Sequence, residues 1–230
     1  MRLFLNYRNL FLFLEKNLLL ALIVIPTENL SDWKIDKFSK IPPNIVSASK
    51  LGLLVKVKGS AGPIIYPFKA KVTISEFTIA GDFKGLPVFS EKSKQGGKGF
   101  DDYALRIGFI VPGEKKLTGL KKLFAPQWVK QLYAQVPEGT GLDHIQFFNV
   151  TQNVDQLGQQ RHHPASDLIH EDFFKLVDIK GPFNYKYSFK TPLDALAVWI
   201  SIDGDDTQSE FDVLINKLEL NTSELPASNN

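Results

Sequence analysis

The fold is decided by residues 195–220, which run ALAVWISIDGDDTQSEFDVLINKLEL. Residues 196–202 are almost continuously apolar, as expected of a strand that is covered on both faces. Asp203-Gly-Asp-Asp206 then supplies residues that favour a tight turn. Residues 211–220 mostly alternate between apolar and polar, which predicts a strand with one side facing solvent. The two arms together predict an antiparallel hairpin and place the chain among the β proteins.

Short β patterns recur through the rest of the chain. Runs of this kind lie at 45–49, 51–58, 64–68, 72–80, 103–111, 143–151 and 185–189, while 166–178 fits a strand or a helix. Apolar residues at helical spacing mark residues 114–135, and Pro126 is expected to divide this segment into two short helical pieces. The pattern predicts a mainly β fold, an antiparallel β-sandwich or jelly roll, with one short helical excursion near residues 114–135.

The amino-acid composition further limits the classes of protein and partner to be considered. The 230 residues are 43% hydrophobic and 23% charged, which is typical of one globular domain with a full core. The net charge is +2 with no basic stripe, and no phosphate-binding fingerprint is present, so we expect neither a nucleic-acid nor a nucleotide partner. The absence of cysteine excludes disulfides, thiol catalysis and cysteine-ligated metal sites.

The N-terminus indicates export. Basic residues up to Lys16 precede an apolar core at 18–25, which is typical of a signal peptide and too short to span a bilayer. An uncleaved anchor and an ordinary N-terminal helix are the alternatives. We therefore predict a periplasmic or secreted protein that meets a membrane only through this segment. The expected organisation is a signal peptide or N-terminal apolar segment at 1–30, a single β-sandwich domain at 31–222 and a disordered tail at 223–230.

Three short motifs carry a resemblance to a known family. They are the aromatic opening from Trp33 to Phe38, the run Asp101-Asp-Tyr-Ala-Leu-Arg106, and Asp203-x-Asp-Asp-Thr207. On these motifs the chain resembles the bacterial exported domain-of-unknown-function family 3047, over roughly residues 31–220. The resemblance implies export and a β fold, and it supplies no catalytic residues.

Six residues are candidates for ligand binding. Asp102 and Arg106 would share a face of a strand, either as an ion pair that ties a loop to the sheet or as the polar floor of a cleft. Trp128 and Tyr187 offer rings for sugar stacking. His144 and His163, with Tyr187 and Arg106, are residue types that abstract protons and neutralise a uronate in polysaccharide cleavage.

The acidic turn is the candidate metal site. Asp203, Asp205 and Asp206 could supply oxygens to Ca²⁺, which takes six to eight oxygen ligands. The preferred interpretation is structural, with Asp203 accepting backbone N–H bonds within the turn and Thr207 closing the same turn. We predict no other cofactor.

The chain has no Gly-x-Ser-x-Gly, P-loop or dinucleotide-binding motif, so the sequence favours binding over catalysis. The resulting prediction is an exported β-sandwich module that binds a ligand, with a glycan or another cell-envelope component as the candidate partner. The alternatives are a polysaccharide-cleaving enzyme on a jelly-roll fold and a structural protein of the cell envelope.

Overall fold

Strands make up most of the molecule. The computed structural model describes residues 21–136 and 140–222. The strands are β1 (Ala21–Val24), β2 (Lys34–Ile35), β3 (Ile45–Ser49), β4 (Gly52–Lys58), β5 (Ile64–Phe83), β6 (Leu105–Gly113), β7 (Gly141–Thr151), β8 (Gln160–His163), β9 (Ser166–Leu176), β10 (Gly181–Ser201) and β11 (Glu210–Thr222). The helices are α1 (Gly119–Phe124) and α2 (Gln127–Ala134), with single 3₁₀ turns at Lys92–Lys94 and Val154–Gln156. The predicted β class and the helical excursion are confirmed, and Pro126 divides the two helices as expected.

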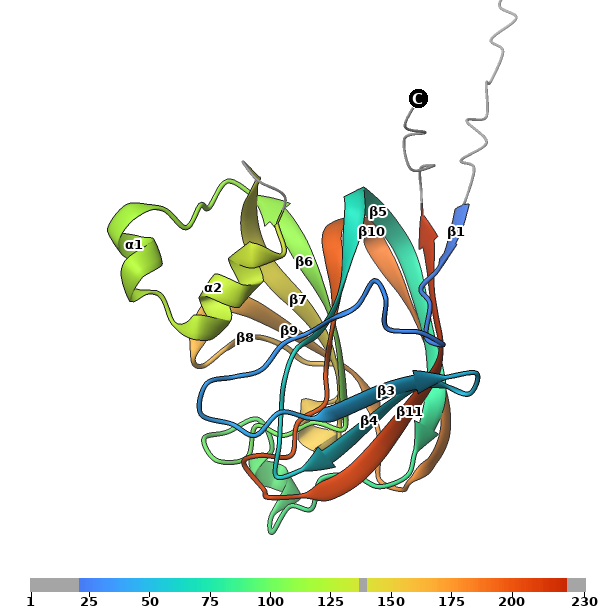
Figure 1. The fold of residues 1–230 in the computed structure, drawn as a ribbon. Coiled ribbons are helices and arrows are strands. Elements are labelled where there is room, and N and C mark those ends of the chain that lie inside the picture. Colours follow the sequence, from blue (N-terminus) through green and yellow to red (C-terminus); the bar gives the residue numbers. More distant parts are fainter. Residues whose placement is uncertain (1–20, 137–139, 223–230) are drawn as a thin grey trace, which may run out of the picture.

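The strands form one hydrogen-bonded sheet that folds over into two layers (Figure 1). Its order is β3-β4-β11-β5-β10-β6-β7-β9-β8. In one layer, residues 181–188 of β10 pair with 76–83 of β5; in the other, residues 193–200 of β10 pair with 64–74 of β5. The register shifts between Ser188 and Leu193, where Pro192 has no N–H to donate and the long strand can bend. Among the pairings of the described residues, only that of β7 with β9 is parallel.

Two expectations about the strands are wrong. The arms of residues 195–220 do not form a hairpin, because β5 lies between β10 and β11. Residues 202–209 instead carry the chain from one layer to the other. The short runs at 64–68 and 72–80 are one strand, β5, and the run at 185–189 continues into β10. β5 and β10 are long and bent because each strand contributes one half to one layer and the other half to the second layer.

Aromatic side chains fill the space between the layers. Phe77 of β5 packs against Phe109 and Phe148 of the opposite layer, at centroid distances of 5.5 and 5.3 Å. A second apolar cluster lies on the outer face of the β6–β7–β10 layer, where Leu132 of α2 covers Ile110 and other buried residues. The helices therefore shield part of this outer face (Figure 1).

The folded unit includes residues that the sequence assigns to the N-terminal segment. β1 pairs with β11, and Ile25 is 1% exposed within the core. Residues 21–25, ahead of the predicted domain start at residue 31, thus add an edge strand and a core side chain. The remainder of the predicted signal segment, residues 1–20, and the predicted tail, 223–230, lie outside the described residues. Neither helix in the described ranges has the length and apolar content needed to cross a membrane.

Candidate functional site

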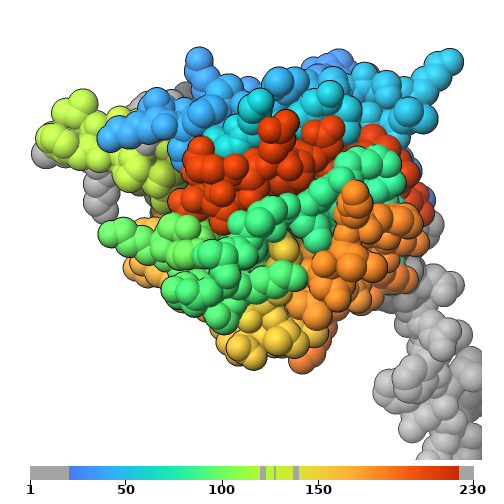
Figure 2. Space-filling model, turned by 90° about the horizontal axis from the view of Figure 1, so that it is seen from below, coloured from blue at the N-terminus to red at the C-terminus, as the bar shows by residue number. Residues whose placement is uncertain are grey.

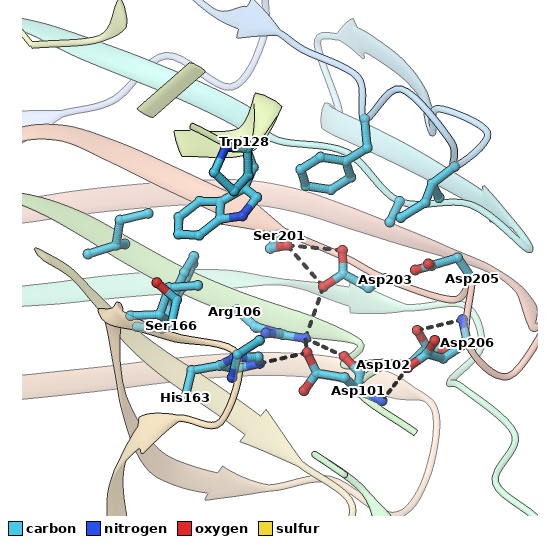
Figure 3. Close-up of a pocket in the computed structure, with 18 of the residues that line it drawn as sticks. Asp101, Asp102, Arg106, Trp128, His163, Ser166, Ser201, Asp203, Asp205 and Asp206 are labelled. Carbon is cyan, nitrogen blue, oxygen red and sulfur yellow. Dashed lines mark hydrogen bonds and ion pairs between the residues drawn. The ribbon is translucent and has the colours of Figure 1, made fainter. Parts of the chain in front are cut away.

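A cleft of about 560 Å³ opens on the outer face of the β6–β7–β10 layer. Trp128 of α2 lies across it from Asp203 and Arg106 (Figure 3). Phe38, from the segment between β2 and β3, also lines the cleft, and Phe147 and Trp199 supply further aromatic lining from the sheet. The cleft therefore combines aromatic surface with a polar floor.

Strand alternation places the floor residues. Side chains two positions apart share a face of a strand, so Trp199 and Ser201 of β10 face the cleft, and Asp203 continues the same row. Phe147 lies directly against the neighbouring strand, because a Cβ at Gly108 would come within 2.6 Å of its ring. Any side chain at position 108 would displace this wall of the cleft.

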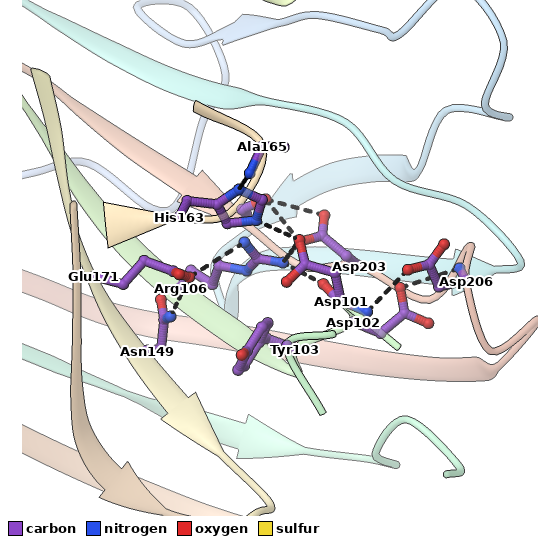
Figure 4. Close-up of polar contacts among 12 residues, drawn as sticks. Asp101, Asp102, Tyr103, Arg106, Asn149, His163, Ala165, Glu171, Asp203 and Asp206 are labelled. Carbon is purple, nitrogen blue, oxygen red and sulfur yellow. Dashed lines mark hydrogen bonds and ion pairs between the residues drawn. The ribbon is translucent and has the colours of Figure 1, made fainter. Parts of the chain in front are cut away.

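Arg106 is the charged centre of the site (Figure 4). Its guanidinium lies 3.2 Å from Asp101, 3.4 Å from Asp203 and 3.9 Å from Glu171, and its side chain is 8% exposed. Glu171 is also held by Arg161, at 2.6 Å, and by the Asn149 amide, at 2.7 Å. A guanidinium buried in this way depends on its partners, since an unpaired buried charge is very costly.

The carboxyl groups of the cleft differ in acidity. Burial alone would raise the pKa of Asp101. The neighbouring Arg106 and His163 outweigh burial and lower this pKa to about 2. Burial raises the pKa of Asp203 to about 7, against the opposing effect of Arg106. Burial and the neighbouring Asp102 and Asp206 raise the pKa of Asp205 to about 6. The site thus holds one strongly ionised acid beside two that bind protons near neutral pH.

His163 has a defined hydrogen-bonding pattern. Its Nδ1 accepts the backbone N–H of Ala165 at 3.1 Å, so Nε2 carries the proton and donates to Asp101 at 3.0 Å. The carboxylate of Asp101 therefore lies between a histidine and an arginine. This arrangement orients Asp101 towards the cleft.

Asp102 has a different role from the one expected. It accepts the backbone N–H groups of Asp206 and Thr207, at 3.2 and 2.7 Å, and the Thr207 hydroxyl at 2.6 Å. Arg106 pairs with Asp101 instead of Asp102, so the predicted pair was assigned to the wrong aspartate. Asp203 accepts the Ser201 hydroxyl, not the turn amides. The acidic turn is therefore organised by a carboxylate more than a hundred positions away, a contact that local turn rules cannot foresee.

The loop that carries these aspartates is fixed in place. Gln95 is buried: its Oε1 accepts Thr151 Oγ1 and the Gln152 N–H at 2.9 and 2.7 Å, and its Nε2 donates to the carbonyl of Asp102 at 2.8 Å. Seen from below, residues 84–100 (green) lie beside β11 (red; Figure 2), and the Val88 N–H donates to the hydroxyl of Ser209, directly before β11, at 2.8 Å. The segment 84–100 therefore positions part of the site.

The structure brings most of the predicted residues together. Asp102, Arg106, Trp128 and His163 line the cleft, and so do the predicted metal ligands Asp203, Asp205 and Asp206. Tyr187 lies elsewhere, stacked on Phe77 at 5.7 Å. His144 also lies apart, stacked on His170 at 3.9 Å.

Sequence reasoning missed Asp101 and Glu171 as partners of Arg106. Asp101 is adjacent to the chosen Asp102, so choosing the wrong member of the pair caused that miss. Glu171 faces the site from β9, two positions from Ile169. Because residues 166–178 fitted either a strand or a helix, the sequence did not predict that Glu171 and Ile169 share a face of a strand.

Asp101, His163 and Glu171 present oxygen and nitrogen atoms within 4.8 Å of one another, a spacing that a metal ion could use. However, Arg106 pairs with Asp101, and Arg161 pairs with Glu171. In the acidic turn, Asp203 faces Arg106 and Ser201, and Asp206 accepts the Asp101 N–H at 2.9 Å. Arginine already pairs with two of the three groups in the first cluster, and in the turn Asp203 and Asp206 already have protein partners, so these residues are a poor fit for a resident cation.

Comparisons with known proteins give no family. No family model and no curated protein matches the chain. Among solved structures, it is similar to a xylan-binding module, CBM15, with 11% identity over 90% of this chain and 99% of the other, at a TM-score of 0.37. It is also similar to the exoplasmic/lumenal domain of VIP36 in a Ca²⁺/Man2-bound form, with 10% identity over 90% and 89%, at a TM-score of 0.37. Similarity this low carries no argument about the ligand of the present chain.

Proposed function

We propose that this protein is an exported carbohydrate-binding module whose ligand occupies the cleft under α2. The observation that carries the proposal is the position of Trp128 opposite a floor of carboxyl groups (Figure 3). Sugar rings present an apolar C–H face and a rim of hydroxyl donors. The cleft offers an aromatic ring for the first and carboxylate acceptors for the second.

The geometry favours binding over cleavage. The polysaccharide-cleaving alternative needs a histidine, a tyrosine and an arginine at one substrate. Arg106 and His163 share the cleft, but Tyr187 packs on Phe77 and His144 lies in a separate histidine stack. In addition, Arg106 is already paired with acids, which leaves it little charge to offer a uronate.

The proposed setting is the periplasm or the cell exterior, with a glycan of the cell envelope or its surroundings as the partner. The structural-protein alternative requires an exposed apolar edge. The end strand β3 exposes Ile45, at 68%, so that alternative stays a prediction.

Calorimetric titration with a panel of oligosaccharides tests the proposal. We expect at least one ligand to bind, and the Trp128→Ala variant to lose about fivefold or more of its affinity, since a stacked ring is worth on the order of 1 kcal/mol or more. Trp33→Phe is the matched control, because Trp33 is buried away from the cleft. Absence of binding to every saccharide, or equal affinity of wild type and Trp128→Ala, would refute the proposal.

A further inference from the structure

Acidic groups outnumber basic ones in the cleft. Its acids are Asp101, Asp102, Asp203, Asp205 and Asp206, and its bases other than histidine are Arg106 and Lys40. The charge of Arg106 is matched by Asp101, Asp203 and Glu171. The ion pairs of the described residues leave Asp205 and Asp206 without a basic partner. One end of the cleft is therefore negatively charged and uncompensated.

We infer, on the basis of the proposed function, that the cleft selects a saccharide bearing a protonated amine, such as a glucosamine oligomer, over neutral or uronate-bearing saccharides. An ammonium group is a compact cation with three hydrogen-bond donors, which suits adjacent carboxylates. Asp205 is half-buried and Asp206 exposed at the same rim, so an amine can reach both while the sugar occupies the cleft. A uronate at this position would meet like charge instead.

Aromatic lining supports the same ligand class. Trp128 lines the cleft that holds Asp205 and Asp206. An aromatic face attracts cations as well as sugar C–H groups. The combination of an aromatic surface and unpaired carboxylates distinguishes this cleft from one built only for neutral sugars.

The acids also predict a proton-linked signature. Burial raises the pKa of Asp203 to about 7, and burial with its acidic neighbours raises that of Asp205 to about 6. The charged groups facing Asp205 are Asp102, Asp206 and Arg106, and those facing Asp203 are Arg106, Asp205 and Asp102. A bound ammonium favours the ionised carboxylates, so the pKa values of both acids fall on binding. At about pH 6, protons that both acids hold in the free protein are then released.

The test is calorimetry at about pH 6 on the full chain, in two buffers of different ionisation enthalpy. The ligands are tetramers of glucosamine, N-acetylglucosamine and galacturonate. We expect the glucosamine tetramer to bind about tenfold more tightly than its N-acetylated counterpart, because a single charge pair in a partly buried site is worth a factor of this order. It should release protons, and its advantage should shrink at high salt.

Two variants localise the effect. Asp205→Asn and Asp206→Asn should each lower the ratio of the affinity for the glucosamine tetramer to that for the N-acetylated tetramer by several-fold. Asp178→Asn is the matched control, because Asp178 is exposed and does not line the cleft. Melting temperatures of all three variants verify that they fold.

The outcomes separate the two proposals. Equal binding of the neutral tetramer without proton release, or tighter binding of the galacturonate, overturns the amine inference and leaves the carbohydrate function standing. Binding of no saccharide at all overturns both. An amine preference that survives in both Asp205→Asn and Asp206→Asn also overturns the inference, since the selecting charge would then lie elsewhere.

Discussion

At the scale of single residues, Arg106 holds the site together. Its guanidinium lies over the ring of Tyr103 at 4.3 Å and meets acids from three separate segments of the chain. Burial of this charge is tolerated because both terminal nitrogens of the guanidinium face carboxylates and the group lies over an aromatic ring. The arginine therefore sets where Asp101 and Asp203 point within the cleft.

The acidity of Asp203 makes stability depend on pH. Its pKa is about 7 in the folded chain, against an ordinary value of 3.8, so between these values the folded chain keeps a proton that the unfolded chain releases. Stability should fall as pH rises through this window. Asp203→Asn keeps an acceptor for Ser201 but cannot ionise. We expect this variant to lose less stability as the pH rises, with a decline in the free energy of unfolding smaller by about 2 kcal/mol.

Urea unfolding at about pH 5 and pH 7.5 measures the effect for wild type and Asp203→Asn. The opposite shift of Asp101, whose pKa is about 2, acts only below this window and does not confuse the comparison. An equal decline in both proteins would show that Asp203 ionises normally.

At the scale of elements, the loop between β5 and β6 depends on Gln95. Its amide joins the loop to residues 151–153 and supports the carbonyl of Asp102. Gln95→Leu should cost about 2 kcal/mol, because it leaves several buried partners without a hydrogen bond. It should also speed amide exchange at residues 93–97.

Denaturant unfolding and hydrogen exchange verify this prediction. Gln159→Leu is the control, because Gln159 is exposed and should change stability by less than about 0.5 kcal/mol. If both leucine variants behave alike, the loop is not fixed through Gln95.

Strands β7, β8 and β9 share a stack of three histidines. His170 lies between His144 and His162, with centroid distances of 3.9 and 4.1 Å. Burial, together with these two neighbours, lowers the pKa of His170. The unfolded chain therefore takes up a proton at His170 before the folded chain does, so stability present above about pH 6.5 is lost as pH falls.

His170→Phe should reduce this acid-induced loss, because the ring remains and the titrating group is removed. Asp143 and Lys115 also act on His170, so both proteins are compared at the same ionic strength. Thermal melts at about pH 7.5 and pH 5 provide the measurement. A decline of equal size in the variant would assign the acid sensitivity to other groups.

At the scale of the whole molecule, two layers meet along the shared strands β5 and β10, and the acidic turn lies on the connection between layers. Millimolar Ca²⁺ should leave the melting temperature unchanged relative to EDTA, because Asp203 and Asp206 already have protein partners. If Ca²⁺ bound the folded state alone, the melting temperature would rise. A Ca²⁺-dependent rise that disappears in Asp205→Ala would instead establish a calcium site in the turn.

Much of the fold follows from local pattern. The alternation of residues 143–151 and 211–220 predicts β7 and β11, and helical spacing broken by Pro126 predicts α1 and α2. These features depend on neighbours within a few positions, so a single sequence reveals them. For the same reason Arg106, Trp128 and His163 could be named as candidates by their chemistry.

The amino-acid sequence by itself determined the β class, the helical excursion and the residue types of the cleft. Only the tertiary structure decided that β5 separates β10 from β11, that Arg106 takes Asp101 and Asp203 as partners, and that Tyr187 belongs to the core. The reason is physical: strand pairing and buried polar contacts join segments a hundred or more positions apart. Their energy depends on which surfaces are excluded from water together, a property of the packed molecule that no local run of residues encodes.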